Sequence, residues 1–104
     1  MEQRDRCVIQ DCLFVWDPKK AQANLDKHNV SFHEAAEVFF DPLYRMEDVS
    51  VEGEQRFGII GYSKQDHLLY VVSAEHGNKA WRIISARTVT THERARYEET
   101  NDLD

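Results

Sequence analysis

From residue 43 onwards, apolar side chains alternate with polar ones over short stretches, and each stretch ends in a polar turn. Alternation with a period of two is typical of β-strands, because successive side chains point to opposite faces of a sheet. Short polar turns between such stretches favour an antiparallel meander. The pattern therefore predicts four consecutive strands, over residues 43–49, 55–62, 68–74 and 79–86.

The N-terminal part of the chain contains two helix signals. Asp17 suits the N-cap of a helix and Pro18 suits its first position, where the missing N–H is no loss. Apolar residues at helical spacing extend this helix to about His28, and Asn29 suits the left-handed residue that closes it. Residues 31–34, Ser-Phe-His-Glu, form a capping box that starts a second helix.

The two ends of the chain complete the predicted fold. A second capping box, residues 90–93, predicts a C-terminal helix through about Glu99. An apolar run over residues 8–15 predicts one strand before the first helix, and residues 1–7 are expected to be partly loose. The length suits one domain, residues 1–104. We expect an α+β fold, with the two N-terminal helices and the C-terminal helix packed on one face of a mainly antiparallel sheet.

Arg82 lies in the middle of the apolar strand predicted over residues 79–86, and Arg87 follows at its exit. An arginine inside such a strand is costly to bury alone, so Arg82 must reach water, a carboxylate or an anionic ligand. Strict alternation places Trp81, Ile83 and Ser85 on one face and Arg82, Ile84 and Ala86 on the other.

The formal net charge of the chain is −6, which argues against nucleic-acid binding as a property of the whole surface. Residues 79–97 differ, because they hold five basic residues and one acid, Glu93, and so carry a charge of +4. This distribution predicts a cationic patch suited to RNA or to an acidic protein partner. Alternatively, these basic residues neutralise the acidic tail, residues 98–104.

Cysteine usage and hydropathy indicate the compartment. Cys7 and Cys12 are too few for a disulfide framework and lack a second pair for a zinc site, so we interpret them as reduced thiols. No apolar run reaches the length of a signal peptide core or a membrane span. These features predict a soluble, cytoplasmic protein that does not interact with a membrane.

The histidines and acids show no spacing that is typical of a metal site. His33 with Glu34, and His92 with Glu93, are adjacent pairs that point in different directions on a helix. The acids within residues 47–54 are better explained as a solvated hairpin than as ligands. We therefore predict no metal and no other cofactor.

Several stretches between Phe14 and Glu99 together resemble the BrnT toxin family, in the order of that family. The C-terminal stretch is RIISAR over residues 82–87, followed by THER over 91–94 and by Tyr97. The other stretches are WDPKK over 16–20 with Asn24, KHNVSFHEA over 27–35, EQRF over 54–57 and IGYS over 60–63.

This resemblance implies a fold similar to that of the RelE toxins. It also implies an endoribonuclease toxin of a type II toxin–antitoxin pair, which cleaves RNA and so inhibits translation and growth. The expected partners are RNA and a neutralising BrnA-like antitoxin of the ribbon-helix-helix, DNA-binding type. DNA would then be bound only through the antitoxin, and a homodimer is left open.

RNA can be cleaved without a metal ion, because its own 2′-hydroxyl can attack the adjacent phosphorus when the protein supplies a base, cations and an acid. Arg82 and Arg87 suit the cationic role, since guanidinium binds phosphate bidentately. His28 suits proton transfer, since histidine exchanges protons near neutral pH, and Tyr97 could orient a phosphate or stack on a base. We expect catalysis from these four residues and RNA binding from Lys27, Arg56, Arg94 and Arg96.

Most of these residues also have a structural interpretation. The alternatives are an ion pair of Arg87 or Arg82 with Glu93 or Glu98, an ion pair of Arg56 with Glu54, a helix-dipole contact of His28 and packing of Tyr97. Two other functions also stay open for the whole protein. One is an antitoxin-binding co-repressor with weak or no ribonuclease activity, and the other is an unrelated small α+β binding domain.

Overall fold

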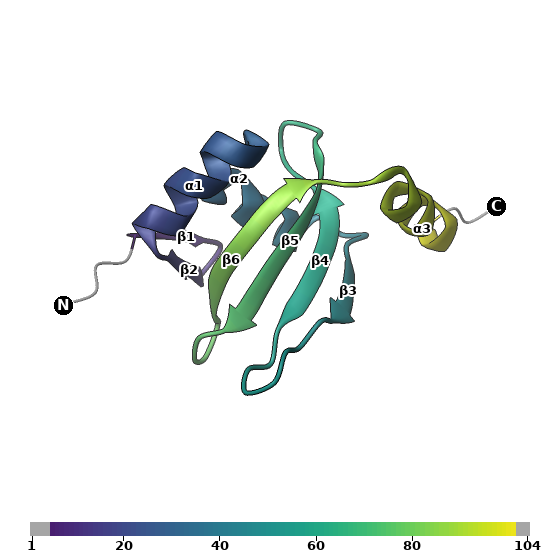
Figure 1. Ribbon diagram of the computed structural model, residues 1–104. Helices are drawn as coiled ribbons and strands as arrows, with labels where there is room; N and C mark the ends of the chain where they lie inside the picture. Colours follow the sequence, from purple (N-terminus) through teal and green to yellow (C-terminus); the bar gives the residue numbers. More distant parts are fainter. Residues whose placement is uncertain (1–4, 102–104) are drawn as a thin grey trace.

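The computed structural model describes residues 5–101, and Figure 1 labels its elements. The strands are β1 (Asp5–Ile9), β2 (Cys12–Trp16), β3 (Arg45–Asp48), β4 (Phe57–Tyr62), β5 (Leu68–Glu75) and β6 (Ala80–Thr88). The helices are α1 (Pro18–His28), α2 (Phe32–Glu37), the 3₁₀ helix η1 (Val38–Phe40) and α3 (Thr91–Asn101). Across this described part of the chain, no helix is both long and apolar enough to cross a membrane.

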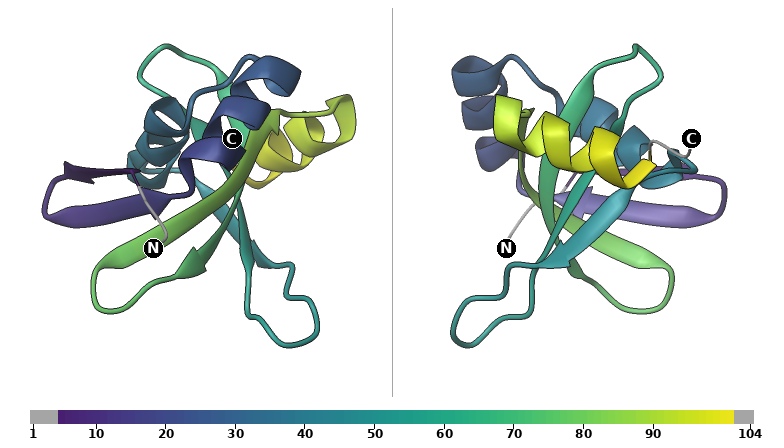
Figure 2. Two further views of the ribbon diagram at one scale, coloured as in Figure 1. Left: turned by 60° about the vertical axis from the view of Figure 1, so that its left-hand side comes forward. Right: turned by 90° about the vertical axis from the view of Figure 1, so that its right-hand side faces the viewer.

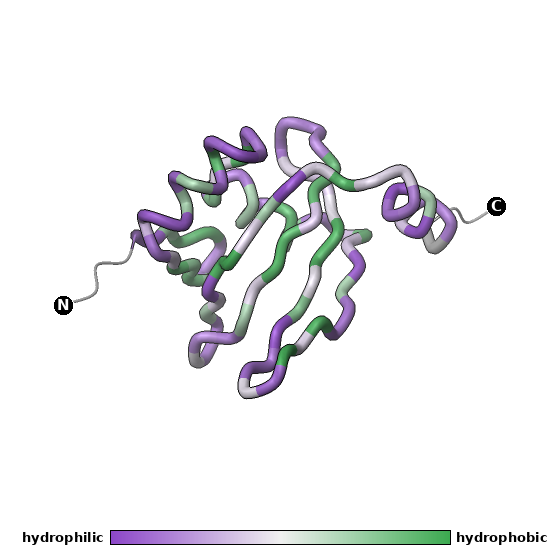
Figure 3. The backbone as a smooth tube through the Cα atoms, in the orientation of Figure 1, coloured by the Kyte–Doolittle hydropathy of each residue, from purple (hydrophilic) through white to green (hydrophobic). Residues whose placement is uncertain are grey.

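The six strands form one sheet in the order β1-β2-β6-β5-β4-β3. The four strands predicted as a meander, β3 to β6, are antiparallel neighbours, so this prediction is confirmed. β2 lies parallel to β6, which makes the sheet mixed. In Figure 3 the apolar residues follow the strands, whereas the turns are mostly hydrophilic.

The prediction of a single strand over residues 8–15 is wrong. β1 and β2 form an antiparallel hairpin, and the chain reverses at Gln10 and Asp11, whose φ angles are 48° and 67°. Turns with two left-handed residues usually contain Asn-Gly. This turn contains Gln-Asp instead, so the sequence did not predict it. β1 also orders residues 5–7, contrary to the expectation of a loose segment, and the rest of that segment, residues 1–4, lies outside the described residues.

α1 begins and ends where the sequence predicts. Asp17 Oδ1 accepts a hydrogen bond from the backbone N–H of Lys19 at 2.8 Å, which caps the helix N-terminus. Asn29 closes the helix in the left-handed region, with φ 57° and ψ 33°. The chain therefore leaves α1 in a fixed direction and starts α2 after a connection of three residues, 29–31.

At the start of α2, the side chain of Ser31 caps the helix, whereas the side chain of Glu34 binds elsewhere. Ser31 Oγ accepts a hydrogen bond from Glu34 N at 3.1 Å. The buried Glu34 carboxylate accepts a bond from Ser63 Oγ at 2.7 Å and lies 2.6 Å from His67 Nδ1, both in the turn between β4 and β5. Glu34 thus ties α2 to this turn.

The helices cover both faces of the sheet, so the prediction that all three pack on one face is wrong. Ile59 belongs to a core formed with α2 and η1, whereas the next residue, Ile60, packs with Tyr97 of α3. Because consecutive strand residues point to opposite faces, α3 lies opposite α2. The right-hand view of Figure 2 shows α3 crossing in front of the strands. We call the face covered by α2 and η1 the inner face and the other one the outer face.

One buried side chain, Asn24, fixes α1 to β6. Its Nδ2 donates to the Ala86 carbonyl at 2.8 Å, and its Oδ1 accepts from the Ala86 N–H at 3.1 Å. Nδ2 also donates to the Val30 carbonyl at 3.0 Å. β2 pairs only with residues 80–82 of β6, so beyond that point Asn24 supplies the partner that a neighbouring strand would provide.

We expect Asn24→Ala to lower the free energy of unfolding by about 2–3 kcal/mol, because it leaves buried backbone groups of Ala86 and Val30 without partners. Urea unfolding followed by tryptophan fluorescence measures this loss. Gln22→Ala is the matched control, since Gln22 is exposed on the same helix and should cost less than about 1 kcal/mol. Equal losses in the two variants would show that Asn24 is not an anchor.

Candidate functional site

A register shift between β5 and β6 decides which side chains of β6 reach the outer face. Val72 pairs with Ser85, but the next residue, Ser73, pairs with Ile83. Ile84 therefore has no partner on β5 and forms a β-bulge. The predicted strict alternation along β6 is wrong beyond Ile84. Each later side chain lies on the face opposite to the one that strict alternation predicts.

The bulge brings Arg82 and Arg87 to one face. Arg82 lies opposite Ala74 and Arg87 opposite Tyr70. Ala74 and Tyr70 are four positions apart on β5 and so share a face, and Tyr70 packs against the outer-face cluster under α3. Without the bulge, arginines five positions apart would point to opposite faces. The outer surface of β6 thus presents Arg82, Ser85 and Arg87.

A groove of about 260 Å³ lies between α1 and β6. Ile84 and Ser85 line it from the strand, and one side of α1 lines it from the helix. Three residues on this side of α1 are basic, namely Lys20, Lys27 and His28. The structure therefore brings the predicted residues Lys27 and His28 beside the stretch of β6 that separates its two arginines. Lys20 was not singled out by the sequence, although its spacing from Lys27 is that of one helix side.

Glu54, in the turn before β4, contacts two of the predicted arginines. Its Oε1 accepts a hydrogen bond from Arg56 Nε at 2.7 Å, and its Oε2 accepts one from Arg82 Nη2. These interactions, chiefly the bond from Arg56, lower the pKa of Glu54. The ion pair of Arg56 with Glu54 matches the alternative offered from the sequence. The link from Glu54 to Arg82 joins positions 28 apart and had no sequence signal.

Arg87 forms the ion pair with Glu93 that the sequence offered as an alternative to catalysis. Its Nη1 and Nη2 donate to the two Glu93 oxygens at 2.7 and 2.9 Å, and its guanidinium carbon lies 4.7 Å from the centroid of the Tyr70 ring. Glu93 also accepts from Thr90 N at 2.9 Å and donates through its own N–H to Thr90 Oγ1 at 3.1 Å, which completes the predicted capping box. The Arg87 bonds, more than any other cause, lower the pKa of Glu93 to about 2.

A second arginine–carboxylate pair joins α3 to β3. Arg96 binds Glu47, and Tyr70 Oη donates to the other Glu47 oxygen at 3.2 Å. Gly58 makes room for this bond, because a Cβ at its position would lie 2.3 Å from Tyr70 Oη. Burial, followed by the charge of Glu47, raises the pKa of Tyr70. Tyr70 thus contacts Arg87 through its ring and Glu47 through its hydroxyl, and the sequence did not indicate these contacts.

Tyr97 holds α3 against the sheet. Its ring is 5% exposed and meets the Tyr62 ring edge to face at a centroid distance of 5.6 Å. Its hydroxyl donates to Asp41 Oδ2 at 2.7 Å, and the same oxygen accepts from Tyr62 N at 2.8 Å. Burial, together with this carboxylate, raises the pKa of Tyr97. This geometry favours the packing interpretation of Tyr97 over a role at a phosphate.

The cationic patch predicted over residues 79–97 is largely neutralised within the chain. Arg82, Arg87 and Arg96 each have a carboxylate partner. Arg94 is exposed on α3 and has no ion pair among the described residues. Among the described residues, Lys20 and Lys27, which line the groove beside α1, have no carboxylate partner, and they lie outside the segment that the charge count singled out.

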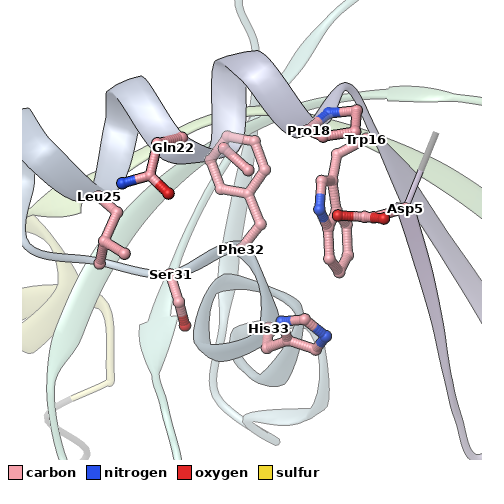
Figure 4. Close-up of a pocket in the computed structure, with 9 residues that line it drawn as sticks. Asp5, Trp16, Pro18, Gln22, Leu25, Ser31, Phe32 and His33 are labelled. Atoms are coloured by element: carbon pink, nitrogen blue, oxygen red, sulfur yellow. The ribbon is translucent and has the colours of Figure 1, made fainter. Parts of the chain in front are cut away.

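A second depression, of about 180 Å³, lies between α1 and the start of α2 (Figure 4). Trp16 and His33 line it, with their ring centroids 4.9 Å apart. None of the predicted site residues contributes to it. Over residues 5–101, no group of three or more His, Cys, Asp or Glu side chains is placed to hold a metal ion.

Comparisons with known proteins bear on this arrangement. A family model described as ribonuclease toxin, BrnT, of type II toxin–antitoxin system matches residues 16–93. No curated protein matches the chain. The chain is similar to the crystal structure of the Brucella abortus ribonuclease toxin BrnT, with 25% sequence identity, a TM-score of 0.56, and coverage of 73% of this chain and 94% of that one. The family match includes the groove and both arginines of β6.

The pair of Arg87 with Glu93 predicts an acid-sensitive contribution to stability. Because the pKa of Glu93 falls from 4.5 to about 2 on folding, this contribution is complete above pH 4.5 and is lost as the pH falls towards 2. Glu93→Gln should lower the free energy of unfolding at neutral pH by roughly 1–3 kcal/mol and flatten its decline in acid. Urea unfolding at a series of pH values measures both effects. Glu98→Gln, at an exposed position of α3, should leave the curve unchanged, and an identical curve for Glu93→Gln would contradict the assignment.

Tyr97→Phe separates packing from catalysis. The change removes the hydroxyl bond to Asp41 and keeps the ring, so we expect the free energy of unfolding to fall by about 1 kcal/mol. The rate of RNA cleavage by the folded variant should stay within about twofold of the original. Thermal unfolding and a single-turnover cleavage assay measure the two quantities. A drop in the cleavage rate of more than about tenfold, in a folded variant, would favour the role of Tyr97 at the phosphate.

Proposed function

Because the family model spans residues 16–93, the chain belongs to the BrnT family of ribonuclease toxins of type II toxin–antitoxin systems, and we propose that it cleaves RNA without a metal ion in the groove between α1 and β6. The basic residues of α1 support this location. Three basic residues of α1 line a groove whose other wall is the stretch of β6 between Arg82 and Arg87. Basic side chains beside an open groove suit the backbone of a single RNA strand.

The basic residues of the groove, together with Arg82 two residues before its β6 wall, are suited to transphosphorylation. Lys20 and Lys27 bind phosphates of the strand, since their ammonium groups are point charges on flexible stems. His28 takes the proton of the 2′-hydroxyl, whose oxygen then attacks the adjacent phosphorus. The bond from phosphorus to the 5′-oxygen breaks, and the 5′-oxygen takes a proton from water. Arg82 stabilises the negative charge that develops on the phosphorane, because its guanidinium stays charged and binds two oxygens. The products are a 2′,3′-cyclic phosphate and a free 5′-hydroxyl.

The remaining predicted residues have supporting roles in this proposal. Arg94 is exposed on α3 and extends the RNA-binding surface beyond the groove. Arg87 is a positioning residue, because both of its terminal nitrogens are engaged by Glu93. Arg96 is similarly engaged by Glu47, so it contributes less to RNA binding than Arg94.

A type II toxin has an antitoxin partner. We propose a ribbon-helix-helix antitoxin that places acidic side chains over the groove, where they compete with RNA for Lys20, Lys27 and Arg94. DNA would be bound through the antitoxin alone. A co-repressor that keeps the antitoxin-binding surface without cleaving RNA is the alternative function.

The purified chain should cleave single-stranded RNA in excess EDTA, and His28→Gln should lower the rate by roughly 10²–10³-fold, because the proton acceptor is lost. Lys27→Ala should weaken RNA binding. Lys19→Ala is the matched control, since Lys19 is exposed on α1 but does not line the groove. Gel-resolved cleavage, fluorescence anisotropy with labelled RNA and thermal unfolding provide the measurements.

Three outcomes would contradict parts of this proposal. Cleavage that requires an added divalent cation would rule out the metal-independent mechanism. Equal losses in the Lys19 and Lys27 variants would remove the groove from the binding site. No cleavage by a folded original chain would favour the co-repressor.

A further inference from the structure

We propose that the guanidinium groups of Arg56 and Arg82 form a binding site for an RNA phosphodiester, and that the carboxylate of Glu54 occupies this site in the free chain. The inference rests on the proposed function, since it adds Arg56 as a second guanidinium at the phosphodiester that Arg82 binds. Glu54 then acts as an internal competitor of RNA.

The bonds of Glu54 have the geometry of a bound phosphate. Its two oxygens are used separately, Oε1 by Arg56 Nε at 2.7 Å and Oε2 by Arg82 Nη2. The two non-bridging oxygens of a phosphodiester also form a pair of anionic acceptors, and guanidinium binds such pairs well. A phosphodiester can therefore replace the carboxylate between the same two arginines.

The exposure of the three side chains permits this exchange. The exposed fractions are 31% for Arg56, 22% for Arg82 and 36% for Glu54, so an RNA strand can approach them from solvent. Both ion pairs are partly exposed, so water and salt screen them and lower their net contribution to the free energy. An incoming phosphate thus has to overcome only a weak interaction.

The turn that carries Glu54 does not depend on its side chain. The backbones of Val51 and Glu54 exchange two hydrogen bonds, at 3.1 and 3.0 Å, around Gly53, which has φ +87°. The Glu54 side chain can therefore rotate away from the arginines while this turn keeps its shape. Only the side-chain bonds are exchanged when a phosphate binds.

Glu93, on the same face of the sheet, is less exposed than Glu54 and has an additional backbone partner. Its side chain is 13% exposed, and it also accepts the backbone N–H of Thr90 at the start of α3. Displacing it would uncap the helix as well as break its bonds to Arg87. The contrast assigns the exchangeable role to Glu54 and a structural role to Glu93.

The test measures the binding of a 2′-O-methyl RNA oligonucleotide, which cannot be cleaved because it has no free 2′-hydroxyl. Glu54→Gln should bind it roughly threefold to tenfold more tightly than the original chain, because two arginines lose their competing carboxylate. Glu52→Gln is the matched control, since it removes the same charge from an exposed position of the same turn. It should improve binding by less than about twofold. Fluorescence anisotropy measures the affinities, and thermal unfolding checks that the variants are folded.

A second arm uses inorganic pyrophosphate and follows the arginine Nε–Hε signals by NMR. The signals of Arg56 and Arg82 should shift at lower pyrophosphate concentrations in Glu54→Gln than in the original chain. If they do while the original chain fails to cleave RNA, the site stands and the proposed function fails. Weaker binding by Glu54→Gln would show that Glu54 orients the arginines, and an equal gain from Glu52→Gln would reduce the effect to net charge. Either result overturns the inference.

Discussion

The register shift between β5 and β6 is the constraint on which the candidate site depends. A single unpaired residue, Ile84, moves the later side chains of β6 to the other face and so places Arg87 on the same face as Arg82. The shift lies two residues before Ala86, whose backbone is held by Asn24 of α1. The irregular part of the strand and the basic side of α1 are thus fixed to each other. Bulges are known to re-aim side chains in this way beside functional sites.

Pairing within the chain, more than the charge count, decides which cations are available. The arginines nearest to α3 are engaged by carboxylates that also hold that helix, as Arg87 is by Glu93. Lys20, Lys27 and His28 of α1 lie instead along an open groove. The outer face therefore divides into a side that secures α3 and a side that suits an anionic ligand. Arg82 and Arg87 flank the stretch of β6 that lines this groove, and the Arg82 partner Glu54 is partly exposed.

Membership of the BrnT family supplies the class of activity, and we propose the groove between α1 and β6 as its location. A metal-independent reaction needs cations and a proton acceptor within reach of one strand of RNA. In this chain α1 brings Lys20, Lys27 and His28 to one groove, whose other wall is Ile84 and Ser85 of β6. We propose that the antitoxin acts at the same groove, since covering it would remove the proposed site from RNA. Inhibition and substrate binding would then compete for the same charges.

The sequence by itself determined the features that depend on neighbouring residues. These include the helix start at Asp17, the end at Asn29, the capping box before α3 and the meander from β3 to β6. The family motifs likewise indicated His28 and Arg82 as candidate site residues. Only the tertiary structure decided the bulge, the parallel pairing of β2 with β6, the face that α3 covers and the link of Arg82 to Glu54. Each of these depends on contacts between residues far apart in the chain, where local spacing carries no information about register, face or partner.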